Sequence, residues 1–172
     1  MKVRLQSPHL ARRAALAAML GALALVSGCI RNEAAPAFDY TLLDGSKHHS
    51  TALRGQVLML NFWATSCAVC VNEMPELAAT HRQFAAQGLQ TLAVAMQYDA
   101  PALVADFTEK RGLPFGVVID NTGAVARAFG DVKATPTTLL VNRSGRIVWR
   151  HEGAPSFPQL RSRIAQLLAE SA

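Results

Sequence analysis

The stretch LMLNFWATSCAVC, residues 58–70, decides the fold of this chain. Its first half is an apolar run typical of a buried central strand, and its second half begins a helical pattern. Cys67 and Cys70 stand at the junction, three residues apart. A helix N-terminus carries partial positive charge and free N–H groups, so it stabilises a thiolate. The stretch therefore predicts a strand, a short loop and a helix whose first turn presents a reactive cysteine pair.

Apolar periodicity predicts the elements on either side of this junction. Residues 40–43 and 47–49 should pair as a hairpin around Asp44-Gly45. Pro75 should kink the helix that follows the cysteines. Because strands alternate with helices until a closing hairpin, we expect an α/β fold with a mixed, partly parallel sheet covered on both faces. Strands are expected at residues 56–63, 89–96, 115–119, 137–141 and 146–151, and helices at residues 67–86, 101–111, 124–129 and 156–169.

The first 28 residues have the composition of an export signal. They hold four basic side chains, no acidic one, and an apolar run over residues 14–26. That run is short for a membrane span, which needs about 20 apolar residues. Val26-Ser27-Gly28-Cys29 resembles a bacterial lipobox, in which the cysteine becomes the first residue and carries the lipid. An ordinary cleaved signal and an uncleaved anchor are the alternatives.

These features predict the domain organisation and the location. We expect a lipoprotein signal peptide over residues 1–28, a lipidated tether over 29–37 and one domain over 38–172. A lipidated Cys29 would hold the domain on the periplasmic side of a membrane, since two acyl chains anchor a protein stably. Ile30 follows the cysteine, and this pattern is similar to that of lipoproteins sent to the outer membrane.

Charge and cysteine content narrow the function classes. The chain has 17 basic and 12 acidic side chains. The excess lies mostly in the signal, so the remaining domain gives no argument for a nucleic-acid partner. With Cys29 assigned to lipid, an isolated pair is left in an oxidising compartment. The loop it encloses is too short to stabilise much, which favours a redox centre. A zinc site is the alternative, but it needs two further ligands.

Residues 38–171 resemble the thioredoxin fold, and more narrowly the exported TlpA/ResA-like thiol-disulfide oxidoreductases. The run at residues 62–70 is similar to the active-site run of that family, and Pro75 matches its helix-kinking proline. The segment at residues 134–146 is similar to the one that carries the family's cis-proline. Residues 97–130 resemble the strand and helix inserted in this subgroup. The chain departs from the family pattern at Ser66 and Ala68-Val69, which affects the redox poise rather than the fold.

The resemblance assigns roles to the residues near the cysteine pair. It implies that Cys67 attacks a partner disulfide and that Cys70 resolves the mixed disulfide. Glu73 lies three residues after Cys70 on the same helix face. The resemblance gives it proton handling, which a buried carboxyl of raised pKa could perform. A solvated surface glutamate is the alternative. Asn61 occupies the position of a buried aspartate in thioredoxin.

The cis-proline segment and a tryptophan complete the expected site. A cis Thr135–Pro136 bond would turn the backbone so that Thr135 pairs with an extended substrate segment. An ordinary edge-strand or turn proline is the alternative. We expect Trp63 to border the substrate site, with part of its role in core packing.

The expected function is reduction of disulfides in specific client proteins, without a cofactor. By resemblance, the clients carry the haem-site cysteines of apocytochrome c or the cysteines of a copper site. A membrane electron donor would then reduce the pair again. Three alternatives remain at this point: a disulfide-introducing oxidase, a copper carrier that uses the cysteine pair with a histidine, and a peroxidase. The last is disfavoured, because no single cysteine lies in a threonine-containing loop ahead of a helix.

Overall fold

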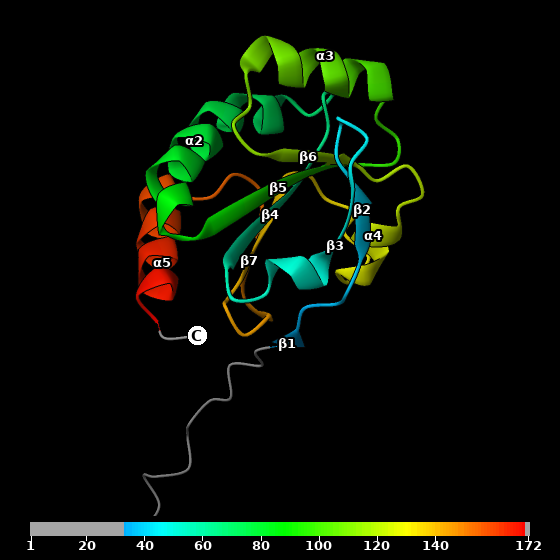
Figure 1. Ribbon diagram of the computed structural model, residues 1–172. Coiled ribbons are helices and arrows are strands. Elements are labelled where there is room, and N and C mark those ends of the chain that lie inside the picture. The colour runs from blue at the N-terminus through cyan, green and yellow to red at the C-terminus, as the bar shows by residue number, and fades with distance from the viewer. Residues whose placement is uncertain (1–32, 171–172) are drawn as a thin grey trace, which may run out of the picture. The chain divides into compact units, whose positions relative to one another are not determined.

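The computed structural model describes residues 33–170, and a six-stranded sheet forms the centre of this part of the chain (Figure 1). The strand order is β1-β8-β7-β4-β5-β6, and a separate hairpin pairs β2 with β3. Strands β4, β5 and β6 are parallel, whereas β7, β8 and β1 run antiparallel to their neighbours. The strands are β1 (Glu33–Ala34), β2 (Asp39–Thr41), β3 (Lys47–His49), β4 (Val57–Trp63), β5 (Leu89–Ala95), β6 (Gly116–Ile119), β7 (Thr137–Val141) and β8 (Arg146–Glu152).

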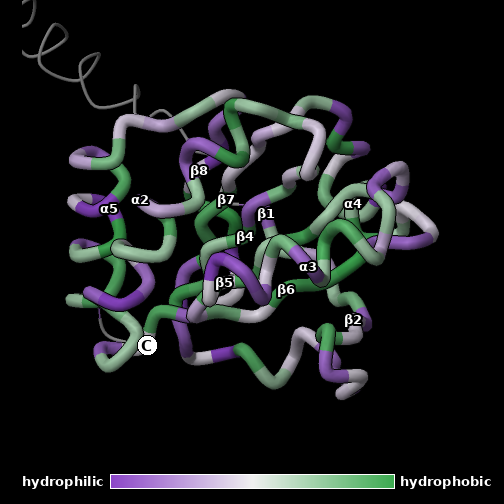
Figure 2. The backbone as a smooth tube through the Cα atoms, turned by 90° about the horizontal axis from the view of Figure 1, so that it is seen from above, coloured by the Kyte–Doolittle hydropathy of each residue, from purple (hydrophilic) through white to green (hydrophobic). Residues whose placement is uncertain are grey.

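Helices cover both faces of this mixed sheet. Helices α2 and α5 pack on one face, together with part of α3, while the β2-β3 hairpin and α4 cover the other. Helix α5 alternates between hydrophilic and hydrophobic residues, as its single apolar stripe requires (Figure 2). The helices are α2 (Ala68–Phe84), α3 (Pro101–Arg111), α4 (Ala124–Ala128) and α5 (Phe157–Ala169), with 3-10 turns η2 (Ser50–Leu53) and η3 (Ala85–Gln87).

Strand β4 lies between β5 and β7, and every residue in it is buried. Alternate side chains of a strand point to opposite faces. Val57, Met59 and Trp63 accordingly join the core under α2 and α5. Leu58, Leu60 and Phe62 join the core under the hairpin and α4. The continuous apolar run of the sequence is therefore the strand that divides the two cores.

The two ends of α2 follow from local sequence. Cys67 precedes the helix in extended conformation, and its side chain accepts a hydrogen bond from the backbone N–H of Cys70. Pro75 lies inside the helix, as the sequence predicts. After the 3-10 turn η3, Gly88 takes the left-handed conformation that only glycine adopts readily, with φ of 103°. The chain then enters β5, parallel to β4.

The α/β fold with a mixed sheet is confirmed, and each predicted element lies within about two residues of its expected bounds. One boundary differs. Glu33 and Ala34 fall in the expected tether, yet they pair with Ile147 and Arg146 of β8 as an edge strand. Residues 1–28 and Cys29 lie outside the described residues. Within residues 33–170, no helix is both long and apolar enough to cross a membrane.

Candidate functional site

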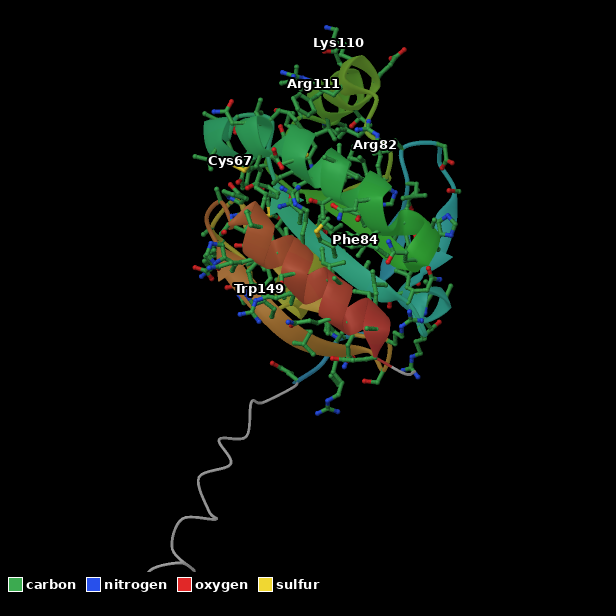
Figure 3. All side chains as sticks on the ribbon, turned by 90° about the vertical axis from the view of Figure 1, so that its left-hand side faces the viewer. Cys67, Arg82, Phe84, Lys110, Arg111 and Trp149 are labelled. Atoms are coloured by element: carbon green, nitrogen blue, oxygen red, sulfur yellow. A yellow bond between two sulfur atoms is a disulfide. The ribbon has the colours of Figure 1, made fainter. Side chains whose placement is uncertain are left out.

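The candidate site is the Cys67–Cys70 disulfide at the N-terminus of α2. The two sulfurs are bonded, and the Cα atoms lie 5.2 Å apart. Strand β4 ends at Trp63, a short loop follows, and α2 begins at Ala68. Figure 3 shows Cys67 at the end of α2 that lies on the same side of the domain as α3. The predicted strand, loop and helix start are therefore present.

The two cysteines have different surroundings. Cys67 is half-buried, whereas Cys70 is fully buried, with 0% exposure. The backbone N–H of Cys70 donates to Cys67 Sγ over 3.2 Å. In the reduced protein this bond and the helix N-terminus would favour the thiolate form of Cys67. Of the two cysteines, Cys67 is the accessible one, and its sulfur accepts a hydrogen bond from a backbone N–H.

The segment before β7 forms the opposite wall of the site. The Thr135–Pro136 bond is cis, as the resemblance predicts. Thr135 contributes its carbonyl oxygen, which lies 3.6 Å from Cys67 Sγ. Pro136 is buried, and Thr135 is partly exposed beside the sulfur. A segment bound to Cys67 would therefore meet the backbone of Thr135.

A buried polar group lies beneath the cysteine pair. Glu73 is only 4% exposed, and Asn61, on β4, is fully buried. The amide nitrogen of Asn61 donates to Glu73 Oε1 and to Thr138 Oγ1, both over 3.0 Å. Burial raises the pKa of Glu73 to about 7, and the hydrogen bond from Asn61 opposes this in part. Glu73 is therefore a buried carboxyl poised near neutral pH, not a solvated surface residue.

Of the two roles expected for Trp63, core packing is the one that the structure shows. Its side chain is fully buried, and its ring packs against Phe107 of α3 with centroids 5.2 Å apart. A residue with no exposed surface cannot touch a client protein. Trp63 instead supports the cysteine loop from the core.

Sequence reasoning missed one contact to the cysteine loop. Asp99 follows β5, and its carboxylate accepts hydrogen bonds from the backbone N–H and the hydroxyl of Thr65, each over 2.6 Å. Thr65 precedes Cys67 by two residues. A signal for this contact exists, because the carboxyl ends of parallel strands converge on one edge of a sheet, where sites form.

Metal ligation finds little support in the described part of the chain. Among residues 33–170 there is no group of three or more histidine, cysteine, aspartate or glutamate side chains that could hold an ion. His81 bonds with Thr91, and His151 stacks on Trp149. Within these described residues the cysteine pair therefore has no cluster with a histidine that would complete a copper site.

Comparison with known proteins gives a family match over most of the chain. A family model described as Redoxin matches residues 31–167. The thiol-disulfide oxidoreductase ResA of Geobacillus thermodenitrificans is 39% identical over 114 residues, which is 66% of this chain and 64% of that protein. ResA of Bacillus subtilis is 34% identical over 66% of this chain and 63% of that protein. The matches thus cover slightly less than two thirds of these relatives.

Solved structures share the fold. A Neisseria meningitidis protein named as a thioredoxin superposes with a TM-score of 0.75 at 35% identity, over 81% of this chain and 93% of its own. A Chlorobium tepidum protein named as the thiol:disulfide interchange protein DsbE gives 0.74 at 27% identity, over 80% and 97%. The thioredoxin-like fold expected from the sequence is therefore confirmed.

Proposed function

Because the chain belongs to the redoxin family, we propose that it is a thiol-disulfide oxidoreductase that reduces disulfides of client proteins. One observation carries this proposal above the others. Cys67 is accessible at a helix N-terminus with an N–H donor 3.2 Å from its sulfur, while its partner Cys70 is fully buried. Such a pair suits attack by the first sulfur and resolution by the second. The names of the ResA relatives support the same chemistry.

The proposed reaction begins from the reduced pair. The Cys67 thiolate attacks one sulfur of a client disulfide, the client S–S bond breaks, and the other client sulfur leaves as a thiolate. Cys70 then loses its proton, and its thiolate attacks Cys67 Sγ. This second exchange releases the first client sulfur and leaves the Cys67–Cys70 disulfide seen here. Two electrons pass to the client, and a membrane electron donor restores the dithiol.

Glu73 is the proposed acceptor of the Cys70 proton. It lies one turn after Cys70 on α2, and burial raises its pKa to about 7. A carboxylate with a pKa near the working pH is an efficient general base. The second oxygen, Oε2, has no hydrogen-bond partner among the described residues, so it is free to take the proton.

The proposed setting is the extracytoplasmic face of a membrane. A lipidated Cys29 would tether the domain there, and the resemblance to outer-membrane lipoproteins extends the proposal to that membrane. The clients would be proteins whose cysteines must be reduced for metal or haem insertion, such as apocytochrome c or a copper-site protein. Thr135 would pair with the extended client segment beside Cys67, since its carbonyl already lies 3.6 Å from that sulfur.

The test is to trap clients in cells. The Cys70→Ser variant lacks the resolving thiol, so it should accumulate mixed disulfides through Cys67 that migrate as reducible adducts. The Cys67→Ser variant keeps the buried thiol and serves as the matched control. Adducts of equal abundance in both variants would contradict the assigned roles.

The direction of transfer needs a separate measurement. A midpoint potential near or below the thioredoxin value of about −270 mV would support a reductant. A value near about −120 mV would instead indicate an oxidase that introduces disulfides. Equilibration of the pair with glutathione, followed by alkylation of free thiols, gives this number.

A further inference from the structure

The strongest polar contact to the cysteine loop comes from outside that loop. Asp99 lies in the segment between β5 and α3 and is only 7% exposed. Its two carboxylate oxygens each accept one hydrogen bond from Thr65, one from the backbone N–H and one from the hydroxyl, both over 2.6 Å. None of the ion pairs among residues 33–170 includes Asp99. Thr65 therefore supplies the hydrogen bonds that satisfy this buried charge.

Thr65 lies in the part of the loop that fixes the position of Cys67. The loop leaves β4 at Trp63, and the N–H of Cys67 closes a turn by donating to the carbonyl of Ala64 over 3.1 Å. Thr65 is inside that turn. Because Asp99 binds both the backbone and the side chain of Thr65, it restricts the position and the orientation of the turn. Little freedom is then left to the sulfur two residues later.

The same segment also reaches the opposite wall of the site. Tyr98, next to Asp99, places its hydroxyl 3.4 Å from the hydroxyl of Thr135. Thr135 is the residue whose carbonyl lies 3.6 Å from Cys67 Sγ. Residues 98–99 thus contact the cysteine loop on one side and the cis-proline segment on the other. One short segment therefore contacts both walls of the site, with the shorter hydrogen bonds made to the cysteine loop.

We propose that Asp99 is a positioning residue for Cys67: by holding Thr65, it keeps the sulfur at the N–H of Cys70 and against the carbonyl of Thr135. This inference rests on the proposed role of Cys67 as the attacking cysteine. Because a thiolate gains stability from a donor only while the sulfur stays within hydrogen-bond distance, a loosened loop lowers the thiolate fraction. Asp99 acts through Thr65 and has no contact with the client.

The Asp99→Ala variant removes both hydrogen bonds and should expose the effect. A hydrogen bond to a charged group changes an equilibrium by roughly tenfold or more. In the reduced variant, the rate of Cys67 alkylation at pH 7 should fall about tenfold, and its pH midpoint should rise by about one pH unit. The Asp99→Asn variant keeps an acceptor for the Thr65 N–H and can donate to the Thr65 hydroxyl. It should stay within about threefold of the wild type.

Asp120 offers a matched control for a purely structural role. It is also buried, at 4% exposure, and its carboxylate accepts the backbone N–H groups of Val125 and Ala126 in α4, over 3.2 and 2.8 Å. Asp120→Ala should lower the thermal midpoint but leave the alkylation midpoint of Cys67 unchanged. If Asp99→Ala does not fold, Thr65→Ala removes only the hydroxyl bond and should slow alkylation about threefold, with Thr65→Ser restoring the rate.

The outcomes separate this inference from the proposed function. If Asp99→Ala leaves the alkylation profile of Cys67 unchanged, or if Asp99→Asn shifts it as far as Asp99→Ala, positioning by Asp99 is wrong. An equal shift in Asp120→Ala would also overturn it, because general destabilisation would then explain the effect. Should the wild-type Cys67 react no faster than Cys70, the proposed function itself fails.

Discussion

The two faces of strand β4 both bury apolar side chains, but they differ in the polar groups that they hold. Toward the hairpin and α4, the strand presents Leu58, Leu60 and Phe62, which are apolar and buried. Toward α2 it presents Val57, Met59 and Trp63, which are also apolar and buried, and among them Asn61, whose amide donates to Glu73 and to Thr138. The first is apolar throughout and is called the apolar face here; the second, called the polar face, adds a buried acid to an apolar core.

The polar face carries a cost that the apolar face does not. Burying a polar atom without a hydrogen bond is unfavourable. Asn61 Oδ1 and Glu73 Oε2 are buried and have no partner among the described residues. The comparison teaches that both sides of the central strand bury apolar side chains, and that the side toward α2 also accepts an unfavourable buried acid. Substitutions on both faces test this comparison.

The largest expected effect is on the apolar face. Phe62 is fully buried and packs near Phe129, with ring centroids 6.0 Å apart. Phe62→Ala should lower the free energy of unfolding by about 3–5 kcal/mol, because it leaves a cavity in a close-packed core. Denaturant unfolding of the oxidised protein measures this. The alkylation rate of Cys67 in the folded fraction should not change, and a large change there would contradict the comparison.

The next effect lies on the polar face and has the opposite sign. The pKa of Glu73 rises from 4.5 to about 7 on folding. Below pH 4.5 the carboxyl is protonated in both states, so folding loses nothing. As pH rises toward 7 the unfolded chain ionises first and stability falls, and above pH 7 the loss is complete. Glu73→Gln should therefore stabilise the oxidised protein at pH 8 by roughly 3 kcal/mol and leave stability at pH 4 nearly unchanged.

The same Glu73→Gln variant should slow the proposed catalytic step. Glutamine cannot accept the Cys70 proton, so release of the client from a mixed disulfide should slow by about tenfold or more and lose its pH dependence near 7. Stopped-flow reduction of a disulfide peptide measures that step. A variant that is more stable at pH 8 yet equally fast would leave Glu73 without a catalytic role.

The sequence was sufficient to predict the elements and the cysteine pair. Periodicity is local, so the strand ending at Trp63 and the helix after Cys67 could be located from spacing alone. The cover over Trp63 could not be predicted, because it depends on α3, whose Phe107 packs on it from 44 positions along the chain. Local pattern carries no information on which helix covers which residue.

The polar group under the site also depends on distant pairing. Asn61 and Thr138 are directly opposite each other in the β4–β7 ladder, although 77 residues separate them. Sequence alone fixes neither that register nor the approach of Asp99 to Thr65 across 34 residues. Glu73 could be proposed from its helical spacing to Cys70, but its burial required the assembled sheet.

A smaller effect is expected from Thr138. Thr138→Val keeps the shape but removes the oxygen that accepts from Asn61, which should cost about 1 kcal/mol of stability. A less anchored Asn61 should also bond Glu73 more weakly. The pKa of Glu73 in the folded protein should then rise slightly, and with it the pH at which the loss of stability is complete. The matched control is Thr137→Val on the opposite face, where the hydroxyl donates to the Ala134 carbonyl over 2.7 Å. If both variants move the step equally, Asn61 does not link Thr138 to Glu73.

The smallest effect concerns His81, which lies on α2 and contacts β5 on the same side of the sheet as Glu73. His81 bonds with Thr91 over 3.1 Å and meets the ring of Phe115 edge-on. Burial, and secondarily the charge of Arg82, lowers its pKa below 6.5. The folded protein then binds a proton less readily than the unfolded chain, so His81 makes stability fall as pH drops below 6.5. This slope is opposite to that of Glu73, and weaker because the ring is partly exposed.

The two slopes can be separated by combining variants. Glu73→Gln removes the loss of stability that Glu73 causes as pH rises toward 7. In this variant the free energy of unfolding should therefore decrease from pH 8 to pH 5, because His81 still titrates. Adding His81→Gln to that background should flatten the decline, because glutamine does not titrate. If the decline persists unchanged in the double variant, a group other than His81 senses acid on this face. Glu73 would then be the one residue near the cysteine pair to which a pH-dependent change in stability is assigned.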